Sequence, residues 1–159
     1  MVILGQCYFG VRDRAMAFSE TYEVIIMKAF IVALRVLAAA FVAVACLHLF
    51  LGLGADATLG VQVPPDIARD PSFDSQNRFY GVTFALLGVV LFIAATDLTR
   101  YRAMVLAVLG VLFMAGIARA VAWMLHGAPA PGLIGILVAD FVLPPVLYLW
   151  FGRVTRNTA

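Results

Sequence analysis

The chain has 159 residues, of which 64% are hydrophobic and only 13% are charged, and its mean hydropathy is +1.03. A soluble domain is about 45–50% apolar and about 25% charged, and a chain of this size must still cover itself with polar surface, so the composition excludes an ordinary soluble protein. The net charge of +2 does not indicate a nucleic-acid partner, because Lys and Arg stand at segment ends rather than on one stripe.

The first 26 residues form an N-terminal extension that is either cytoplasmic or interfacial. The stretch "SETYEVII" fits a helix at the membrane interface. Alternatively, the true start is Met27, since "MKAFIVALRVL" reads as an ordinary beginning of a membrane protein. Both interpretations stay open, and residues 27–159 are predicted to form the transmembrane domain.

Four apolar segments follow, and each is long enough to cross a bilayer as a helix, which needs about 20 residues. None of them alternates with period two, so helix is favoured over strand. The predicted spans cover residues 29–53, 79–96, 103–125 and 133–151.

The connections between the spans support an all-α bundle. Residues 54–76 are rich in proline and aspartate and predict an extramembrane loop, with Asp74 or Ser75 as the N-cap of the second helix. The joints "TDLTRYR" and "HGAPAPG" are short turns. Short connections make neighbouring helices antiparallel, so we expect a polytopic four-helix transmembrane bundle.

The distribution of Lys and Arg predicts the orientation, because these residues gather on the cytoplasmic side of membrane proteins. They cluster before the first span, between the second and third spans, and in the C-terminal tail. We therefore expect both termini in the cytoplasm and the loop 54–76 outside.

Two charged residues inside the spans need partners, because charges in lipid are costly and usually face a bundle interior. At about 1.5 Å rise per residue, Arg119 lies roughly 9 Å and Asp140 roughly 11 Å below the outer ends of adjacent antiparallel spans. The matching depths predict an Arg119–Asp140 ion pair. Such a pair either only fixes the register of the helices or belongs to a binding pocket.

Other polar and aromatic side chains reach the same outer level. We expect them to share one outward-facing pocket with Arg119 and Asp140, to which all four spans contribute. Two of them, Tyr80 and Trp123, are also ordinary interface anchors. The further candidates are His48, Asn77, Arg78, Tyr80, Trp123 and His126.

Two prolines follow the intramembrane aspartate. Proline has no N–H, so Pro144 frees the carbonyl of Asp140 and Pro145 frees that of Phe141. We expect a kink at this point of the fourth helix. Freed carbonyls are tolerated in lipid only where protein or water satisfies them, and Arg119 has donors to spare.

Three motifs, "NRFYG" at 77–81, "GIAR" at 116–119 and "ADFVLPP" at 139–145, resemble a family of small bacterial membrane proteins. That family is catalogued as a domain of unknown function with four predicted membrane helices, and the resemblance covers roughly residues 28–151. It implies a multi-pass protein of the bacterial cytoplasmic (inner) membrane. It also implies that Asp140 often has glutamate as its counterpart, so the shorter aspartate here requires a closer approach of the third and fourth helices.

The leading functional hypothesis is a non-enzymatic membrane protein. Its polar pocket would bind a small, anionic or lipid-like ligand, or dock onto a larger complex or a second copy. The alternatives are a lipid-modifying enzyme, in which His48 is the acid/base and Asp140 its partner, and a small transporter subunit. We expect no metal or cofactor, because no Cys/His cluster has the spacing of metal ligands.

Overall fold

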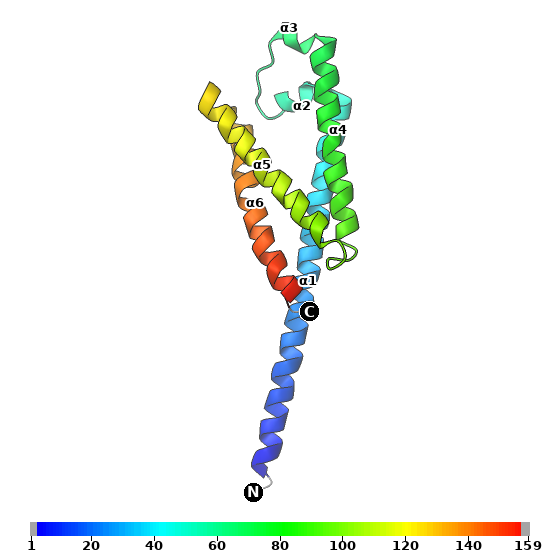
Figure 1. The fold of residues 1–159 in the computed structure, drawn as a ribbon, viewed down its shortest axis with the longest axis vertical. Helices are drawn as coiled ribbons and strands as arrows, with labels where there is room; N and C mark the ends of the chain where they lie inside the picture. The colour runs from blue at the N-terminus through cyan, green and yellow to red at the C-terminus, as the bar shows by residue number, and fades with distance from the viewer. Residues whose placement is uncertain (1–2, 157–159) are drawn as a thin grey trace.

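The computed structural model describes the backbone of residues 3–156 and the side chains of residues 21–156. Four long helices and two single turns make up this range (Figure 1). In chain order they are α1 (Ile3–Leu51), α2 (Gly54–Ala57), α3 (Pro65–Ala68), α4 (Pro71–Ala94), α5 (Arg102–His126) and α6 (Pro131–Arg156). The predicted all-α fold is confirmed, and residues Thr21–Leu51 of α1 together with α4, α5 and α6 are the four candidate spans.

Helix α1 runs without a break from the N-terminal extension into the first span. Its first turns project beyond the other helices (Figure 1). The helix ends at Leu51, where Gly52 adopts a φ of 55°. This left-handed conformation favours glycine, and it turns the chain from the first span into α2.

Helix α4 begins earlier than the apolar pattern indicated. Asp70 is its N-cap, and the Asp70 carboxylate accepts hydrogen bonds from the N–H groups of Ser72 at 2.7 Å and Phe73 at 3.4 Å. Pro71 fits the first helical position, where a missing N–H costs nothing. The predicted N-cap at Asp74 or Ser75 is therefore wrong, because both residues lie inside the helix. Residues 54–76 accordingly contain α2, α3 and the start of α4.

The helices pack as two antiparallel hairpins, α1 with α4 and α5 with α6. Small residues allow the close approach in the first hairpin. A Cβ atom on Gly88 would crowd the Ala38 carbonyl and the Val42 side chain, and one on Gly81 would overlap His48. Small residues at such positions let membrane helices bring their backbones together.

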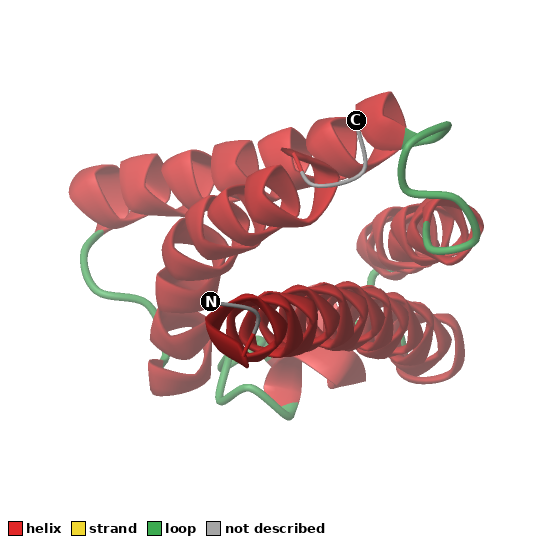
Figure 2. Cartoon of the chain, turned by 90° about the horizontal axis from the view of Figure 1, so that it is seen from below, coloured by secondary structure: helices red, strands yellow, loops and turns green. Residues whose placement is uncertain are grey.

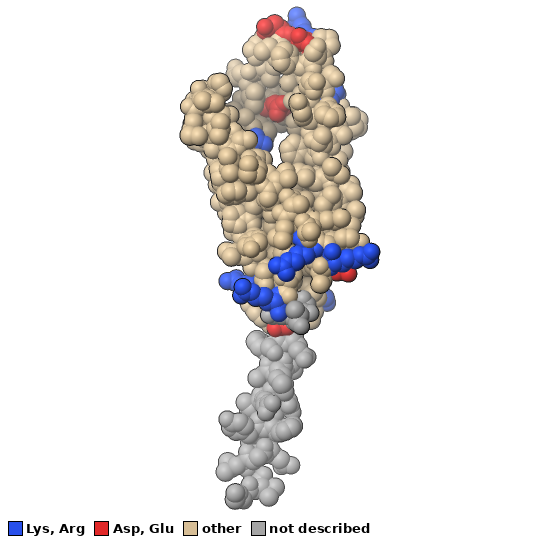
Figure 3. All heavy atoms as spheres, in the orientation of Figure 1, with Lys and Arg blue, Asp and Glu red and all other residues tan. Residues whose placement is uncertain are grey.

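The buried core occupies only one half of the bundle. It is formed by residues 30–41 of α1, 91–98 at the end of α4, 105–112 of α5 and 147–154 of α6. Phe30 is the first core residue of α1 and is fully buried, stacked on Phe151 at 5.6 Å and edge-on to Trp150 at 5.4 Å. We call this end of the molecule the basic end, because it carries Lys28, Arg100, Arg102, Arg153 and Arg156. A belt of basic side chains is visible there in Figure 3.

Toward the opposite end, which we call the loop end because it holds α2, α3 and the turn 127–130, the hairpins diverge. The α5–α6 hairpin leans away from the α1–α4 hairpin (Figure 1, Figure 2). The hairpins meet again where the backbone of Leu59 lies against Gly132 at the start of α6. Figure 3 shows the molecule hollowed between the hairpins, with acidic and basic atoms visible in the hollow.

Candidate functional site

The centre of the candidate site is the contact between Arg119 on α5 and Asp140 on α6. The Arg119 Nε–H donates to Asp140 Oδ2 at 3.0 Å. The Asp140 side chain is 13% exposed and that of Arg119 is 33% exposed. The predicted ion pair is thus present, and its basic member reaches the surface while its acidic member is largely covered.

Gly116, one turn before Arg119, explains how a side chain as short as aspartate makes this contact. It is buried, and a Cβ atom in its place would lie 3.1 Å from the Asp140 Cβ and 3.5 Å from the Phe141 ring. The missing side chain lets α6 approach α5 at the level of Asp140. The close approach that the aspartate requires is therefore supplied by the first residue of the "GIAR" motif.

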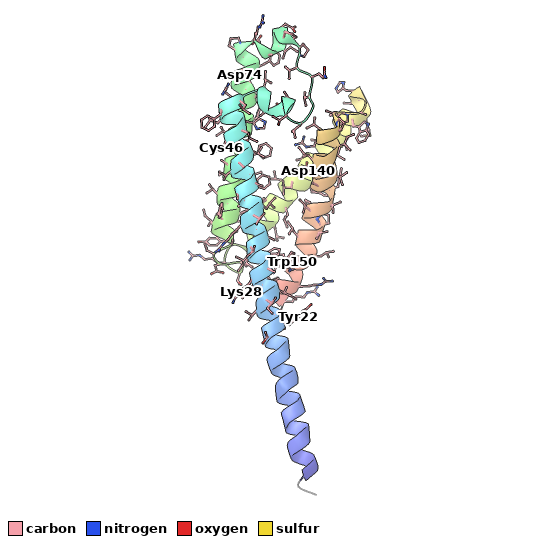
Figure 4. All side chains as sticks on the ribbon, turned by 180° about the vertical axis from the view of Figure 1, so that it is seen from behind. Tyr22, Lys28, Cys46, Asp74, Asp140 and Trp150 are labelled. Atoms are coloured by element: carbon pink, nitrogen blue, oxygen red, sulfur yellow. The ribbon has the colours of Figure 1, made fainter. Side chains whose placement is uncertain are left out.

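The two prolines lie one turn further along α6, which continues as one helix through both of them. Pro144 is buried and Pro145 is exposed. Figure 4 shows Asp140 part-way along α6, at some distance from the loop end where Asp74 lies on α4. The kink at the prolines stays a prediction.

A groove of about 330 Å³ opens beside Arg119, between the loop ends of α5 and α6. Trp123 and His126 extend along it from α5, and Leu133 and Leu137 line it from α6. Its lining is mostly apolar, with the Arg119 guanidinium as its charged group and the imidazole of His126, the last residue of α5, as a second polar group. This combination suits a small ligand that carries both an apolar part and an anionic group.

The first hairpin carries a separate polar cluster around Asp56, a residue of α2. Its Oδ1 lies 3.6 Å from His48 Nε2, and its Oδ2 accepts a hydrogen bond from Asn77 Nδ2 at 2.6 Å. The other imidazole nitrogen, Nδ1, lies 2.9 Å from the Val44 carbonyl oxygen. Because a carbonyl only accepts, Nδ1 is the donor in this contact, and Nε2 is the nitrogen directed at Asp56.

A second ion pair ties the start of α4 to the end of α1. Arg78 Nε donates to Asp74 Oδ2 at 2.7 Å, and its Nη1 donates to the Leu49 carbonyl. The other oxygen of Asp74 accepts from the Leu53 N–H at 3.4 Å. A Cβ atom on Gly52 would collide with Asp74, so the glycine at this turn allows the pair to close over the end of α1.

The eight side chains expected in one pocket thus occupy two hairpins. His48, Asn77 and Arg78 make their contacts within the first hairpin. Arg119, Trp123 and His126 line the groove of the second, where Asp140 binds Arg119. Tyr80 is 63% exposed, and its ring packs edge-on against Phe79 at 5.7 Å.

The sequence interpretation did not assign a side-chain partner to two carboxylates of the first hairpin. Asp56 and Asp74 lie in residues that the apolar pattern assigned to a loop, so neither was considered a partner for a span residue. A signal was present in both cases. The glycines at 52 and 54 indicate that the chain turns back after His48, and Asp74 precedes Arg78 by one helical turn, a spacing that favours ion pairs.

Four long apolar helices, a surface with apolar side chains exposed between its charged ends, and the Arg119–Asp140 ion pair inside two of the spans define an integral, multi-pass membrane protein. Residues 29–151 match the family described as "Domain of unknown function (DUF4345)". The chain belongs to this family. No curated protein and no solved structure matches the chain.

Proposed function

We propose that this protein is a non-enzymatic membrane protein that binds a small lipid-like or anionic ligand in the groove beside Arg119. The observation that carries the proposal is the partly exposed guanidinium of Arg119 in the lining of a mostly apolar groove. Its place would be the bacterial cytoplasmic membrane, with the loop end outside, because the basic residues gather at the opposite end.

The contact with Asp140 supports ligand binding by orienting the guanidinium. Only the Nε–H of Arg119 donates to Asp140, and an arginine fork has further N–H donors on its two terminal nitrogens. A fork of this kind binds carboxylate and phosphate oxygens in a bidentate manner. Asp140 therefore holds one edge of the fork and leaves the terminal nitrogens for a ligand in the groove.

The size and lining of the groove limit the ligand. A volume of about 330 Å³ is near the lower end of the range of about 300–1,000 Å³ for small-molecule sites. The Trp123 ring and the two leucines of α6 offer apolar contact, and His126 adds a polar group. A short-chain lipid phosphate or a small amphiphilic carboxylate would satisfy both the wall and the guanidinium.

The enzyme hypothesis required His48 and Asp140 to act on one another. Each of them has another partner, His48 at Asp56 and Asp140 at Arg119. An enzymatic mechanism would therefore have to use Asp56 as the carboxylate beside the imidazole. It would also need a nucleophile or another reacting group. Ligand binding needs only the groove and its guanidinium.

The test uses the two tryptophans of the chain, Trp123 in the groove and Trp150 elsewhere. In a Trp150→Phe background, Trp123 is the only indole. We expect its emission to change saturably when dihexanoyl phosphatidic acid is titrated into the protein in mild detergent. The Arg119→Leu/Asp140→Leu variant, which removes both charges together, should fold and lose this response.

Arg100→Gln is the matched control, because it removes one arginine at the basic end of the molecule. We expect the control to respond as the parent does. A Trp123 response that persists in the double variant would contradict the proposal, as would an unresponsive parent.

A further inference from the structure

A second and larger groove lies at the basic end, between α1 and α6. Its volume is about 1150 Å³, and residues 22–29 of α1 face residues 146–156 of α6 across it. The groove is remote from Arg119, Trp123 and His126, none of which lines it. It exceeds the range of about 300–1,000 Å³ that is usual for small-molecule sites, so its size favours an occupant larger than a drug-like molecule.

The walls of this groove are apolar. Ile25 and Ile26 of α1 face Val146 and Leu149 of α6, and the Trp150 ring stands between them and the core. Tyr22 and Trp150 come from the two facing helices at the same end of the molecule (Figure 4). Tyr and Trp at the end of a membrane span are typical of the headgroup level of a bilayer, so the apolar walls begin where acyl chains begin.

The rim of the groove is basic. Arg153 and Arg156, on the last turn of α6, line it and are exposed. Glu23 is the acidic residue of the rim, so two guanidiniums face one carboxylate. Within residues 21–156, neither arginine forms an ion pair, and both are therefore able to bind an external anion.

We propose that this groove binds an anionic phospholipid from the leaflet at the basic end. Its acyl chain would lie along the apolar walls and its phosphate would bind between Arg153 and Arg156. Basic pockets between spans at the cytoplasmic surface suit such headgroups, and each basic residue near an anionic surface strengthens binding about fivefold. The site is independent of the ligand proposed for Arg119, which lies at the other end of the bundle.

The test exploits Trp150 as a probe built into the wall of the groove. In a Trp123→Phe background, Trp150 is the only indole. The full chain is reconstituted in phosphatidylcholine vesicles, and a fraction of the lipid is replaced by phosphatidylglycerol or phosphatidylcholine that is brominated near the headgroup end of its acyl chains. Bromine quenches indole emission on contact, so the ratio of the two quenching curves gives the preference for the anionic lipid.

We expect brominated phosphatidylglycerol to quench Trp150 at a lower mole fraction than brominated phosphatidylcholine. Arg153→Gln and Arg156→Gln should each lower this preference about fivefold, and the double variant should abolish it. Arg153→Lys should largely retain it, because an ammonium still binds phosphate as a point charge. Quenching by brominated phosphatidylcholine shows in every variant that Trp150 remains accessible to lipid in a folded protein.

Arg100→Gln/Arg102→Gln is the matched control, since it removes two charges from the same end of the molecule but from outside the groove. Equal quenching by both lipids in the parent would overturn the proposal. So would an equal loss of preference in the control, which would indicate attraction by overall charge. An indole that neither lipid quenches, and whose emission depends on protein dilution, would instead assign the groove to a second copy of the chain.

Discussion

Arg119 and Asp140 allow the sharpest prediction at the scale of single residues. Asp140→Leu leaves a guanidinium that stays charged, whereas Arg119→Leu leaves a carboxylate that is able to become neutral by taking up a proton. We expect Asp140→Leu to be the more destabilising change, at about 3 kcal/mol, the lower end of the range for broken buried pairs. The value is at the lower end because Arg119 is one-third exposed and extends toward the interface.

The double variant Arg119→Leu/Asp140→Leu should be close to the parent in stability, because it leaves no unpaired charge. Thermal unfolding in detergent, followed by circular dichroism, measures the four proteins of this cycle. If the effects of the two single changes simply add in the double variant, the coupling free energy between the two side chains is zero, and the predicted ion pair contributes nothing to stability.

The polar residues also show which side-chain contacts can be predicted from a sequence and which cannot. The Arg119–Asp140 contact was predictable because both residues lie in adjacent spans at matching depth. The His48–Asp56 contact was not, because Asp56 belongs to the single turn α2. No periodicity marks so short an element, and its placement depends on the turn at Gly52 and on the hydrogen bond from Asn77.

At the scale of an element, the start of α4 depends on the Asp70 cap. Asp70→Ala removes the acceptor for the N–H groups of Ser72 and Phe73. We expect a loss of about 1 kcal/mol in the free energy of unfolding, seen as a lowered thermal midpoint in detergent. Hydrogen exchange should also become faster at the first turn of α4 than in the rest of that helix.

Two matched variants separate capping from other effects. Asp70→Asn removes the charge but keeps a side-chain acceptor, so its stability should be close to that of the parent. Ser75→Ala alters a residue inside the helix and should change little. A loss in Asp70→Asn as large as in Asp70→Ala would assign the effect to charge rather than to the cap.

The same helix shows why element boundaries are harder to predict than elements. The apolar run that marks a span begins near residue 79, whereas the helix begins eight residues earlier at Pro71. Hydropathy reports the part of a helix that contacts lipid. The helical turns before it are set by the Asp-Pro cap and by the Asp74–Arg78 pair, both of which are local polar interactions.

For the whole molecule, the orientation in the membrane is the central prediction. Ser72 and Thr99 are exposed near opposite ends of the bundle. In a background without native cysteines (Cys7→Ser/Cys46→Ala), a membrane-impermeant maleimide should label Ser72→Cys in intact cells. Thr99→Cys should be labelled only after the cells are permeabilised, because the basic residues favour the cytoplasmic side.

The reverse labelling pattern would overturn the orientation and would place the groove beside Arg119 on the cytoplasmic side. Labelling of both positions in intact cells would indicate that the chain inserts in two orientations. The parent without cysteines provides the background signal in each case.

The four spans and their helical state follow from the pattern of apolar residues along the chain. A bilayer requires about 20 apolar residues for each crossing and an internal partner for every backbone polar group. A single helix meets both requirements by itself, so a local sequence pattern is enough to predict it. The sequence also predicted the Arg119–Asp140 pair, because two lone charges at one depth in adjacent spans have few other ways to be satisfied.

The packing of the helices, by contrast, could not be predicted from their hydropathy. The hairpins pack tightly at the basic end and diverge toward the loop end, so the polar side chains fall into two clusters. Which residues meet depends on the rotation and crossing of the helices, and these follow from pairwise contacts such as Gly81 on His48 and Gly116 on Asp140. Hydropathy is a property of one helix at a time. It therefore gives the depth of a side chain but not the neighbour it faces.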